Sequence, residues 1–357
     1  MNTRLHKLRE LLKENNLDAA VITGRANTLY FSGFTGSTSY LLVGMDKAWL
    51  IVDFRYTIQA KEQAVKEVEA IEYEDSFHAT INEIIKEHGI CNIGFEGDAL
   101  TFSQYEELKN KLTFAKSLVS LGNKIDRIRI IKDADEIERL QEAVTLGCKV
   151  FDHIVNFIKP GMKETEVAAE IEYTMKKLGA KGPSFETIVA AGPRSALCHG
   201  TASDYTIKKG DAVVLDFGVI YRNYCSDMTR TIFIGEPDPE LKKIYEIVRK
   251  AQEAALEKLV PGISGFDADK AARDIITEAG YGKNFGHGLG HGVGLLIHED
   301  PRLSMKSTDI LTEGMVFTVE PGIYVEGLGG VRIEDMVVFV DGKLRNFTTS
   351  TKDMVII

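Results

Sequence analysis

The sequence predicts two domains: an α/β domain over residues 1–123 and an α+β domain over residues 124–357 with an internal pseudo-twofold repeat. The chain of 357 residues is longer than one ordinary domain, and 44% of it is hydrophobic, enough for sizeable cores. Strand-like and helix-like patterns alternate up to Gly122-Asn123, which is typical of an α/β domain. Beyond that point, similar stretches of sequence occur twice.

Periodicity sets the expected elements of the first domain. Apolar residues at helical spacing predict a helix over residues 4–16. Further on, strands are expected over residues 19–23, 41–53, 90–96 and 118–121, and helices over residues 56–68, 80–88 and 103–112. The glycine-rich segment Ser32–Ser39 fits either a projecting loop or a plain surface loop.

The second domain begins with a predicted acidic helix over residues 133–158, with Asp133 and Asp135 near its positive N-terminal end. The repeat follows. Each copy has a Pro-Gly pair, a helix, a glycine-containing loop with histidine, and an apolar strand introduced by a charged residue and glycine. The first copy contains Pro160-Gly161, a helix over residues 164–178 and Lys209-Gly210; the second contains Pro261-Gly262, a helix over residues 267–279 and Glu313-Gly314.

Charge and composition exclude several classes of function. A net charge of −10 argues against a nucleic-acid partner and against an anionic membrane surface. No apolar stretch approaches the roughly 18 residues of a membrane span, and residues 1–20 do not resemble a signal peptide. The four cysteines are scattered, as is usual in a reducing compartment. We therefore expect a cytoplasmic protein.

Two carboxylates end the apolar strands of the repeat. Asp216 follows Ala212–Leu215, and Glu320 follows Met315–Val319, each at the same distance from its glycine. An ionised carboxylate at the end of a buried strand is costly unless it is paired or binds a metal. Surface charges in two turns would not follow apolar runs, so a metal site is the better interpretation.

A hairpin after each strand would add a second carboxylate. Asp216 and Asp227 are symmetric about Tyr221–Arg222, and Glu320 and Glu334 are symmetric about Gly327, so each pair is expected to lie directly opposed. Four converging carboxylates would balance two divalent cations, and such oxygen ligands suit hard or borderline ions such as Mn²⁺.

Histidines that complete such a site lie in the second copy. His287 and His291 occur in Gly286–Gly294, and His298 follows shortly after. The glycines make a helix implausible there, so the pair of histidines is no zincin motif. The chain also has no G-x-S-x-G nucleophile elbow.

Five motifs, in order, resemble a known family. They are Leu215–Gly218, Ser226–Thr231, Gly290–Leu295, Thr318–Gly322 and Val331–Asp335. Together they closely resemble the proline-specific branch of the pita-bread metallopeptidases, which contains Xaa-Pro dipeptidase (prolidase) and aminopeptidase P. The resemblance covers the whole chain and implies a creatinase N-like first domain and a pita-bread (creatinase/aminopeptidase-like) catalytic domain.

The resemblance also implies the ligand set. By position, Asp216 would bind one metal, Asp227 and Glu334 would bridge both, and His291 and Glu320 would complete the second. Two divalent ions per chain are expected, Mn²⁺ first, with Co²⁺ or Zn²⁺ as alternatives.

Other residues take roles from the same resemblance. His199 and His298 look like the two histidines that stabilise the reacting carbonyl and transfer protons, and His287 resembles a substrate-side histidine. Arg332 looks like the family's arginine behind the ligands, and Thr229 like a hydrogen-bond partner of the metal-bound oxygen. Cys198, next to His199, departs from the proline that relatives often carry at this position.

The implied reaction is hydrolysis of Xaa-Pro bonds in small peptides by a hydroxide held between the metals, with Glu320 accepting its proton. A dipeptidase is preferred to aminopeptidase P, because Arg302 is a candidate partner for a proline carboxylate; an ordinary surface arginine is the alternative. A non-catalytic peptide-binding relative and a metal-free creatinase-type amidinohydrolase also remain, although all five ligands oppose them. The family also suggests a homodimer in which the Ser32–Ser39 loop covers the neighbouring active site.

Overall fold

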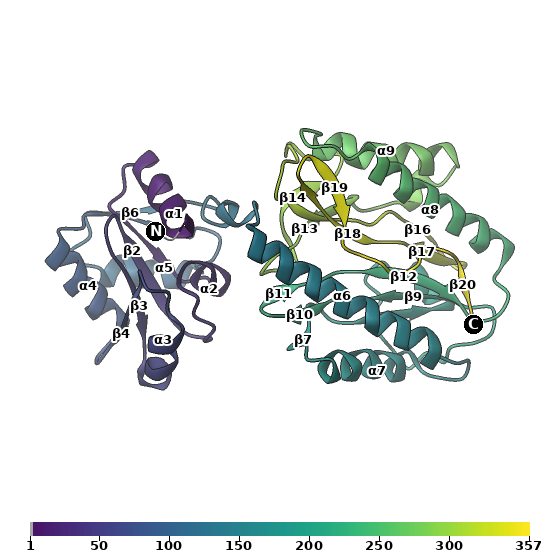
Figure 1. Cartoon of the computed structure of the whole chain (residues 1–357), viewed down its shortest axis with the longest axis horizontal. Coiled ribbons are helices and arrows are strands. Elements are labelled where there is room, and N and C mark those ends of the chain that lie inside the picture. The colour runs from purple at the N-terminus through teal and green to yellow at the C-terminus, as the bar shows by residue number, and fades with distance from the viewer. Residues whose placement is uncertain (1–2) are drawn as a thin grey trace. The chain divides into compact units, whose positions relative to one another are not determined.

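The computed structural model describes residues 3–357, which form two compact units (Figure 1). The first unit ends at Arg129, and the second runs from Ile130 to Ile357. The expected boundary at residue 123 lies within the first unit, just before the short 3₁₀ helix η2 (Asp126–Arg129).

The first unit is a six-stranded mixed sheet flanked by helices. The sheet order is β4-β3-β2-β1-β5-β6, and β1 pairs antiparallel with β2 and parallel with β5. Its strands are β1 (Ala19–Ile22), β2 (Tyr40–Gly44), β3 (Ala48–Val52), β4 (Glu69–Glu72), β5 (Asn92–Phe95) and β6 (Ser117–Ser120). Its helices are α1 (Thr3–Glu14), α2 (Arg25–Ser32), η1 (Phe54–Tyr56), α3 (Thr57–Gln63), α4 (Phe77–His88) and α5 (Phe102–Lys111).

Three elements of this unit differ from the prediction. The expected strand over residues 41–53 is two strands, β2 and β3, which pair antiparallel around residues 45–47. The apolar residues on both sides hid this short turn. Helix α2 and strand β4 were not predicted, because α2 is polar at its start and β4 is a short, partly exposed strand at the edge of the sheet.

The second unit contains four long helices and several small sheets. The helices are α6 (Ala134–Phe157), α7 (Glu164–Lys177), α8 (Pro239–Lys258) and α9 (Gly265–Glu278), with 3₁₀ helices η3 (Gly192–Ala196) and η4 (Gly282–Asn284). Helix α8 was not predicted. The strands of its first half are β7 (Gly182–Pro183), β8 (Ile188–Ala191), β9 (Ala212–Asp216), β10 (Val219–Tyr221), β11 (Tyr224–Cys225) and β12 (Thr229–Phe233). The remaining strands are β13 (Gly290–Gly292), β14 (Glu299–Leu303), β15 (Val316–Val319), β16 (Gly322–Val325), β17 (Gly329–Arg332), β18 (Asp335–Val340), β19 (Lys343–Asn346) and β20 (Val355–Ile356).

The internal repeat is visible in how these strands pair. In the first copy β9 pairs with β8 and β12, and the β10–β11 hairpin connects β9 to β12. In the second copy β15 pairs with β13 and β18, and the β16–β17 hairpin connects β15 to β18. This confirms the predicted pita-bread architecture, in which two equivalent hairpins face the same site.

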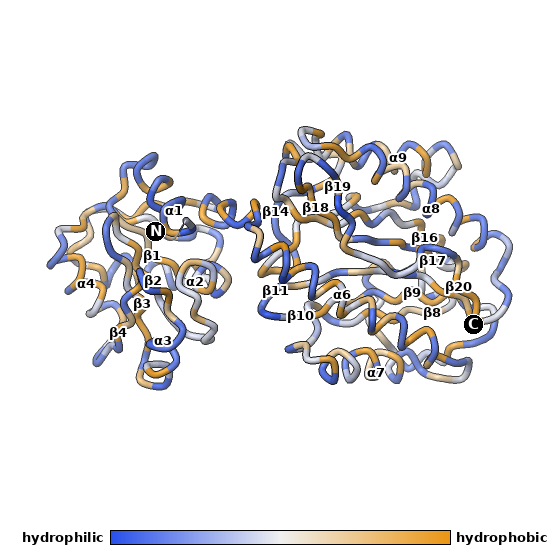
Figure 2. Tube along the Cα trace, in the orientation of Figure 1, coloured by the Kyte–Doolittle hydropathy of each residue, from blue (hydrophilic) through white to orange (hydrophobic). Residues whose placement is uncertain are grey.

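Each copy of the repeat has its own helix pair and hydrophobic core. One core joins α6 and α7 to β9, and the other joins α8 and α9 to β15 and β18. In Figure 1 α7 and α9 lie at opposite edges of this unit, with strands between them. Strands β8 and β9 are mostly hydrophobic in Figure 2, and every residue of both is buried. The carboxylate of Asp216 therefore ends a rigid, buried strand.

No helix formed by residues 3–357 is long and apolar enough to cross a membrane.

Candidate metal centre and active site

The first hairpin brings Asp216 and Asp227 to one place by a different register from the one predicted. Asp216 pairs with Thr229, and Tyr221 pairs with Tyr224. The turn is therefore centred on Arg222 and Asn223, whose φ angles of 47° and 71° are those of a type I′ turn. The predicted direct opposition of Asp216 and Asp227 is wrong by two residues, although both side chains reach the same cavity.

The second hairpin has the predicted register. Val319 pairs with Asp335 at the end of β15, and Gly322 pairs with Arg332 at the start of the β16–β17 hairpin. Glu320 and Glu334 lie between these two pairs and continue the same register. The two glutamates therefore oppose one another as expected.

One cavity of about 480 Å³ collects the residues expected to form the site. Every ligand and catalytic candidate of the sequence analysis lines it except Thr229: His199, Asp216, Asp227, His287, His291, His298, Arg302, Glu320, Arg332 and Glu334. Phe185, Ile188, Cys198 and Thr201 complete much of the wall. The cavity thus combines carboxylates with imidazoles and two arginines, Arg302 and Arg332.

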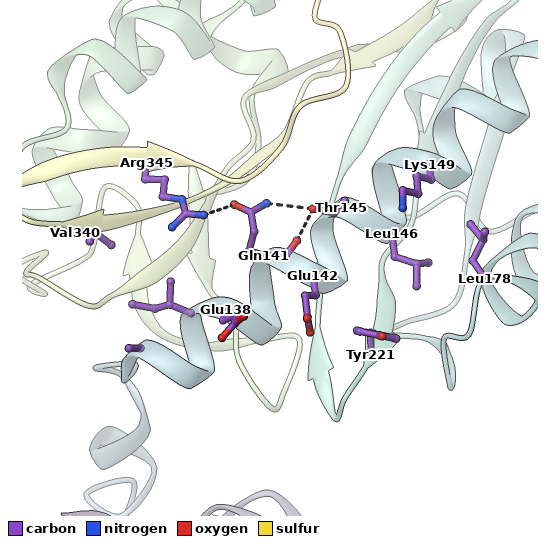
Figure 3. Close-up of a pocket in the computed structure, with 12 residues that line it drawn as sticks. Glu138, Gln141, Glu142, Thr145, Leu146, Lys149, Leu178, Tyr221, Val340 and Arg345 are labelled. Atoms are coloured by element: carbon purple, nitrogen blue, oxygen red, sulfur yellow. Dashed lines mark hydrogen bonds between the residues drawn. The ribbon is translucent and has the colours of Figure 1, made fainter.

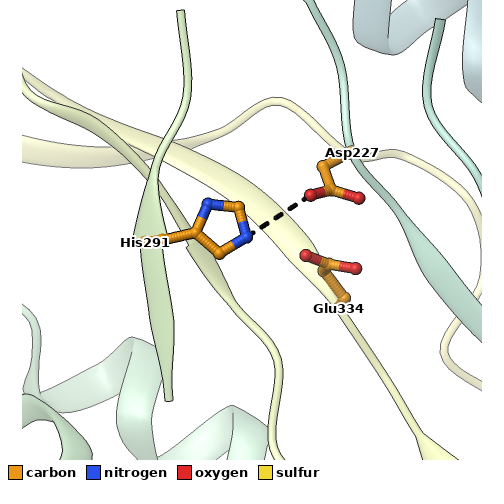
Figure 4. Close-up of side chains that lie close together, drawn as sticks. All are labelled: Asp227, His291 and Glu334. Carbon is orange, nitrogen blue, oxygen red and sulfur yellow. Dashed lines mark ion pairs between the residues drawn. The ribbon is translucent and has the colours of Figure 1, made fainter. Parts of the chain in front are cut away.

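Asp227, His291 and Glu334 form the tightest group (Figure 4). One ligand atom from each lies within 4.8 Å of the others, and all three side chains are buried. The Nε2 atom of His291 lies 3.6 Å from Asp227 Oδ2 and 3.3 Å from Glu320 Oε1. Three different strand or loop segments therefore direct donor atoms at one point.

The protonation state of His291 makes this group a cation site. Its Nδ1 is 3.1 Å from the carbonyl oxygen of Gly292, so Nδ1 carries the proton and donates it there. Burial lowers the pKa of His291 to about 3, so the ring is neutral near pH 7. The Nε2 lone pair then faces carboxylate oxygens, and either a proton or a metal ion between them turns this repulsion into binding.

The buried carboxyl groups of this cluster have raised pKa values. Burial and the neighbouring Asp216 and Glu320 raise the pKa of Asp227 well above its ordinary value. Burial, Asp227 and Glu320 raise that of Glu334 in the same way. Burial is also the main cause that raises the pKa of Glu320 to about 7. Like charges at this density keep protons unless a metal replaces them.

The donor set fits divalent cations. Asp216 Oδ2 accepts a hydrogen bond from Arg332, but the buried Oδ1 has no hydrogen-bond partner among residues 3–357. Buried polar atoms are normally paired, and an orphaned carboxylate oxygen beside three more acidic groups is expected at a metal site. Carboxylate oxygens with one imidazole nitrogen suit Mn²⁺, Co²⁺ or Zn²⁺.

Arg332 organises the floor of the cavity. Its guanidinium donates to Asp216, to the Tyr324 hydroxyl at 2.7 Å and to Thr229 Oγ1 at 3.0 Å. The Thr229 hydroxyl in turn donates to Glu334 Oε2 at 2.7 Å. In this structure Thr229 therefore orients a carboxylate that the sequence analysis assigned to the metals.

Tyr324 is a residue of this site that the sequence analysis missed. His287 Nδ1 is 2.8 Å from the Gly288 carbonyl, so Nδ1 is the donor and Nε2 accepts from the Tyr324 hydroxyl at 3.0 Å. Burial lowers the pKa of His287 to about 4, which agrees with a neutral ring. The available signal was strand periodicity, since Tyr324 follows Glu320 by an even number of extended residues.

His298 and Arg302 also line this cavity. The His298 ring packs edge-on against the His291 ring, with centroids 4.5 Å apart. Burial, together with Arg302 and His199, lowers the pKa of His298, so it is neutral near pH 7. Arg302 lies directly opposite His291 in the β13–β14 pair and has an exposed side chain.

A second, larger cavity of about 650 Å³ runs along α6 (Figure 3). Two of its polar side chains are paired: Arg345 donates to Gln141 at 3.0 Å (Figure 3), and Glu142 pairs at 2.7 Å with Arg222, which does not line the cavity. The residues that line it, all within the described part of the chain, include no histidine. The chemistry expected of a hydrolase therefore lies in the other cavity.

The fold and the acidic cavity define a metallopeptidase of the pita-bread class. Comparison with known families agrees: residues 138–341 match the model of metallopeptidase family M24, and residues 4–131 match the Creatinase/Prolidase N-terminal domain. The chain belongs to metallopeptidase family M24, whose members use divalent metal ions.

Several proteins that are similar over their full length have names that specify a bond to proline. An Xaa-Pro dipeptidase of Pyrococcus horikoshii is 41% identical over 356 residues, 99% of both chains. The solved structure of an Xaa-Pro dipeptidase from Bacillus anthracis has a TM-score of 0.96 and 42% identity, covering 99% of both chains. That of an X-Pro aminopeptidase from Thermotoga maritima has a TM-score of 0.90 and 41% identity, covering 96% of this chain and 98% of the other.

Metal affinity is expected to rise with pH through about 7. Glu320, with a pKa of about 7, and Asp227 and Glu334, whose pKa values are raised, must lose protons before they bind a cation, whereas His291 is already unprotonated at Nε2. Each displaced proton should change the affinity by about tenfold per pH unit. Titration calorimetry of metal-free protein with Mn²⁺, in buffers of different ionisation enthalpy, should show more protons released at pH 6 than at pH 8. Equal release at both pH values would contradict these raised pKa values.

Proposed function

We propose that this chain hydrolyses Xaa-Pro peptide bonds and that Xaa-Pro dipeptides are its preferred substrates. The observation that carries the proposal is the grouping of a carboxylate–histidine cluster, three further histidines (His199, His287 and His298) and Arg302 around one cavity. We further propose two metal ions per chain, held by Asp216, Asp227, His291, Glu320 and Glu334, with Mn²⁺ as the first candidate and Co²⁺ or Zn²⁺ as alternatives.

The metals, when bound, polarise the scissile carbonyl and make water a nucleophile near pH 7. The residues of the chain supply the proton transfers. Glu320 is the proposed acceptor of the proton that the attacking water loses, since its carboxylate lines the cavity 3.3 Å from His291 Nε2. A neutral His298 beside His291 is placed to donate a hydrogen bond to the carbonyl oxygen as negative charge develops.

The leaving proline nitrogen needs a proton donor of its own. The bond before proline is a tertiary amide without N–H, so the usual backbone hydrogen bond to the substrate is missing. The proline nitrogen must be protonated as the bond breaks, and His199 or His298 is the proposed donor. Arg332 and Tyr324 hold Asp216 and His287 in place during these steps.

Peptide length is the remaining choice between dipeptidase and aminopeptidase P. In an Xaa-Pro dipeptide the proline carries a free carboxylate, which needs a cation. Arg302 lines the cavity opposite His291, and no side-chain hydrogen bond or ion pair within residues 3–357 occupies its guanidinium. An arginine fork binds a carboxylate through two parallel hydrogen bonds. A dipeptidase is therefore favoured, with aminopeptidase P as the alternative.

The function is tested by comparing Ala-Pro with Ala-Pro-Ala as substrates of metal-free protein reloaded with Mn²⁺, Co²⁺ or Zn²⁺. We expect metal-dependent hydrolysis of both, with a higher kcat/KM on Ala-Pro. A higher kcat/KM on the tripeptide would favour the aminopeptidase. Absence of hydrolysis with every metal would contradict the proposed activity and leave a peptide-binding protein.

Arg302→Ala should impair dipeptides selectively. Losing a charged hydrogen-bond donor for the proline carboxylate should weaken Ala-Pro by roughly 1.5–3 kcal/mol in kcat/KM. Ala-Pro-Ala, whose proline carboxyl is an amide, should hardly change, and Arg302→Lys should fall between because it lacks the fork. Equal losses on both substrates, or none on either, would exclude Arg302 as the residue that selects length.

A homodimer and a cytoplasmic location remain predictions from the sequence. We propose that the Ser32–Ser39 loop approaches the active site of a second copy and limits substrate length. Its Ser37 hydroxyl contacts the Tyr56 hydroxyl at 2.6 Å, so the loop is tied to the first unit that carries it.

A further inference from the structure

A buried ion pair connects the first residues of the second unit to the strand that follows His298. Lys132 Nζ lies 3.2 Å from Glu299 Oε2, and the two side chains are 1% and 5% exposed. The backbone N–H of Lys132 also donates to the Gly314 carbonyl at 2.9 Å, just before β15. Both the backbone and the ammonium group of Lys132 are therefore held in place.

Glu299 closes the loop that carries His298. Its Oε1 accepts a hydrogen bond from the Leu296 N–H at 3.1 Å, so the chain folds back around the carboxylate. The approach to Gly294 is so close that a Cβ there would lie 2.6 Å from Glu299 Oε2. The same loop is held from the other side by the Cys225 N–H, which donates to the Gly294 carbonyl at 2.8 Å.

This arrangement directs His298 into the cavity. His298 is the last residue of the bend before β14, and Glu299 is the first residue of that strand. The Glu299 side chain binds Lys132, while the His298 side chain lines the cavity, where its ring meets that of His291. The position of the His298 ring therefore depends on the Glu299 anchor.

A buried ion pair of this kind contributes little to the free energy of folding. Removing both charges from water costs about as much as their attraction returns, whereas removing one partner leaves an uncompensated charge. The Lys132–Glu299 pair instead holds the loop in one conformation. Catalytic groups need such fixing, because a misplacement of ~1 Å costs ~10²-fold in rate.

We propose that Lys132 and Glu299 are positioning residues that hold His298 over the metal centre during hydrolysis. The inference rests on the proposed function, since His298 is assigned to the reacting carbonyl. Neither residue lines the cavity, so each acts only through the loop over residues 294–299.

The test compares Lys132→Ala with Lys163→Ala as a matched control. Lys163 forms an exposed ion pair with Asp204 at 3.1 Å, and such pairs contribute little. With Mn²⁺-loaded protein and Ala-Pro, Lys132→Ala should lower kcat by up to ~10²-fold with KM and metal content unchanged. Propylammonium, which fits the space of the missing side chain, should restore part of kcat. Hydrogen exchange over residues 293–299 should become faster in Lys132→Ala and stay unchanged in Lys163→Ala.

A double variant keeps the inference testable if Lys132→Ala does not fold. Lys132→Met with Glu299→Gln removes both charges and retains an acceptor for the Leu296 N–H, so it should fold and exceed Lys132→Met in kcat. Wild-type kcat in the single variants, or a loss of kcat that follows loss of metal, would overturn the positioning role. An inactive wild-type protein would instead refute the proposed function, while the exchange of residues 293–299 would still report on the anchor.

Discussion

Asp227→Asn is expected to lose both metal ions and nearly all activity. Asp227 belongs to the tightest ligand group, its Oδ2 lies 3.6 Å from His291 Nε2, and its side chain is buried. Asparagine keeps the shape but removes the negative charge, so the site loses a ligand proposed to bridge both ions. Loss of a supporting partner alone costs up to ~10²-fold in metal affinity, so loss of this ligand should cost more.

The measurement is metal content per chain after dialysis, together with turnover of Ala-Pro. Asp204→Asn, a surface change of the same chemistry, should retain both, and circular dichroism should show that Asp227→Asn remains folded. Removing a crowded buried charge should also make the metal-free variant no less stable than metal-free wild type, because the pKa of Asp227 is raised in the folded state. Two metals per chain with near-normal turnover would exclude the bridging role.

The sequence predicts the carboxylates of this site because of where they fall, not because of their number. Asp216 and Glu320 end apolar strands, and this pattern has few explanations other than a metal or an ion pair. The second hairpin also has the predicted register, since the glycines around Gly327 mark the turn correctly. Both arguments use residues close together in the chain.

The first hairpin shows the limit of such reasoning. Its turn requires positive φ at Arg222 and Asn223, and an arginine gives no signal for that conformation. Counting symmetry between Asp216 and Asp227 therefore placed the turn too early. A shift of the turn by one residue moves the register by two, which keeps the side chains on the same face and explains why the site survives the error.

Contacts between distant segments were beyond prediction. Lys132 and Glu299 are 167 residues apart, and neither lies in a motif that indicates a partner. Helix α8 was not predicted, although its N-cap Asp238 and the following Pro239 are ordinary helix-start signals. Tyr324 is recognised as part of the site only when the folded hairpin brings it between Arg332 and His287.

His298→Ala and His199→Ala are expected to lower kcat by about 10²–10⁴-fold while leaving metal content intact. Both rings line the cavity, but neither belongs to the Asp227, His291 and Glu334 group. Burial lowers the pKa of His298, so near pH 7 the neutral ring can donate one hydrogen bond and accept a proton in turn.

His153→Ala, which removes an exposed histidine paired with Glu170, is the matched control and should keep wild-type turnover. Single-turnover kinetics on Ala-Pro with parallel metal analysis provides the measurement. If either cavity variant loses metal in proportion to its activity, that histidine is a ligand, and its assignment to the carbonyl and to proton transfer is wrong.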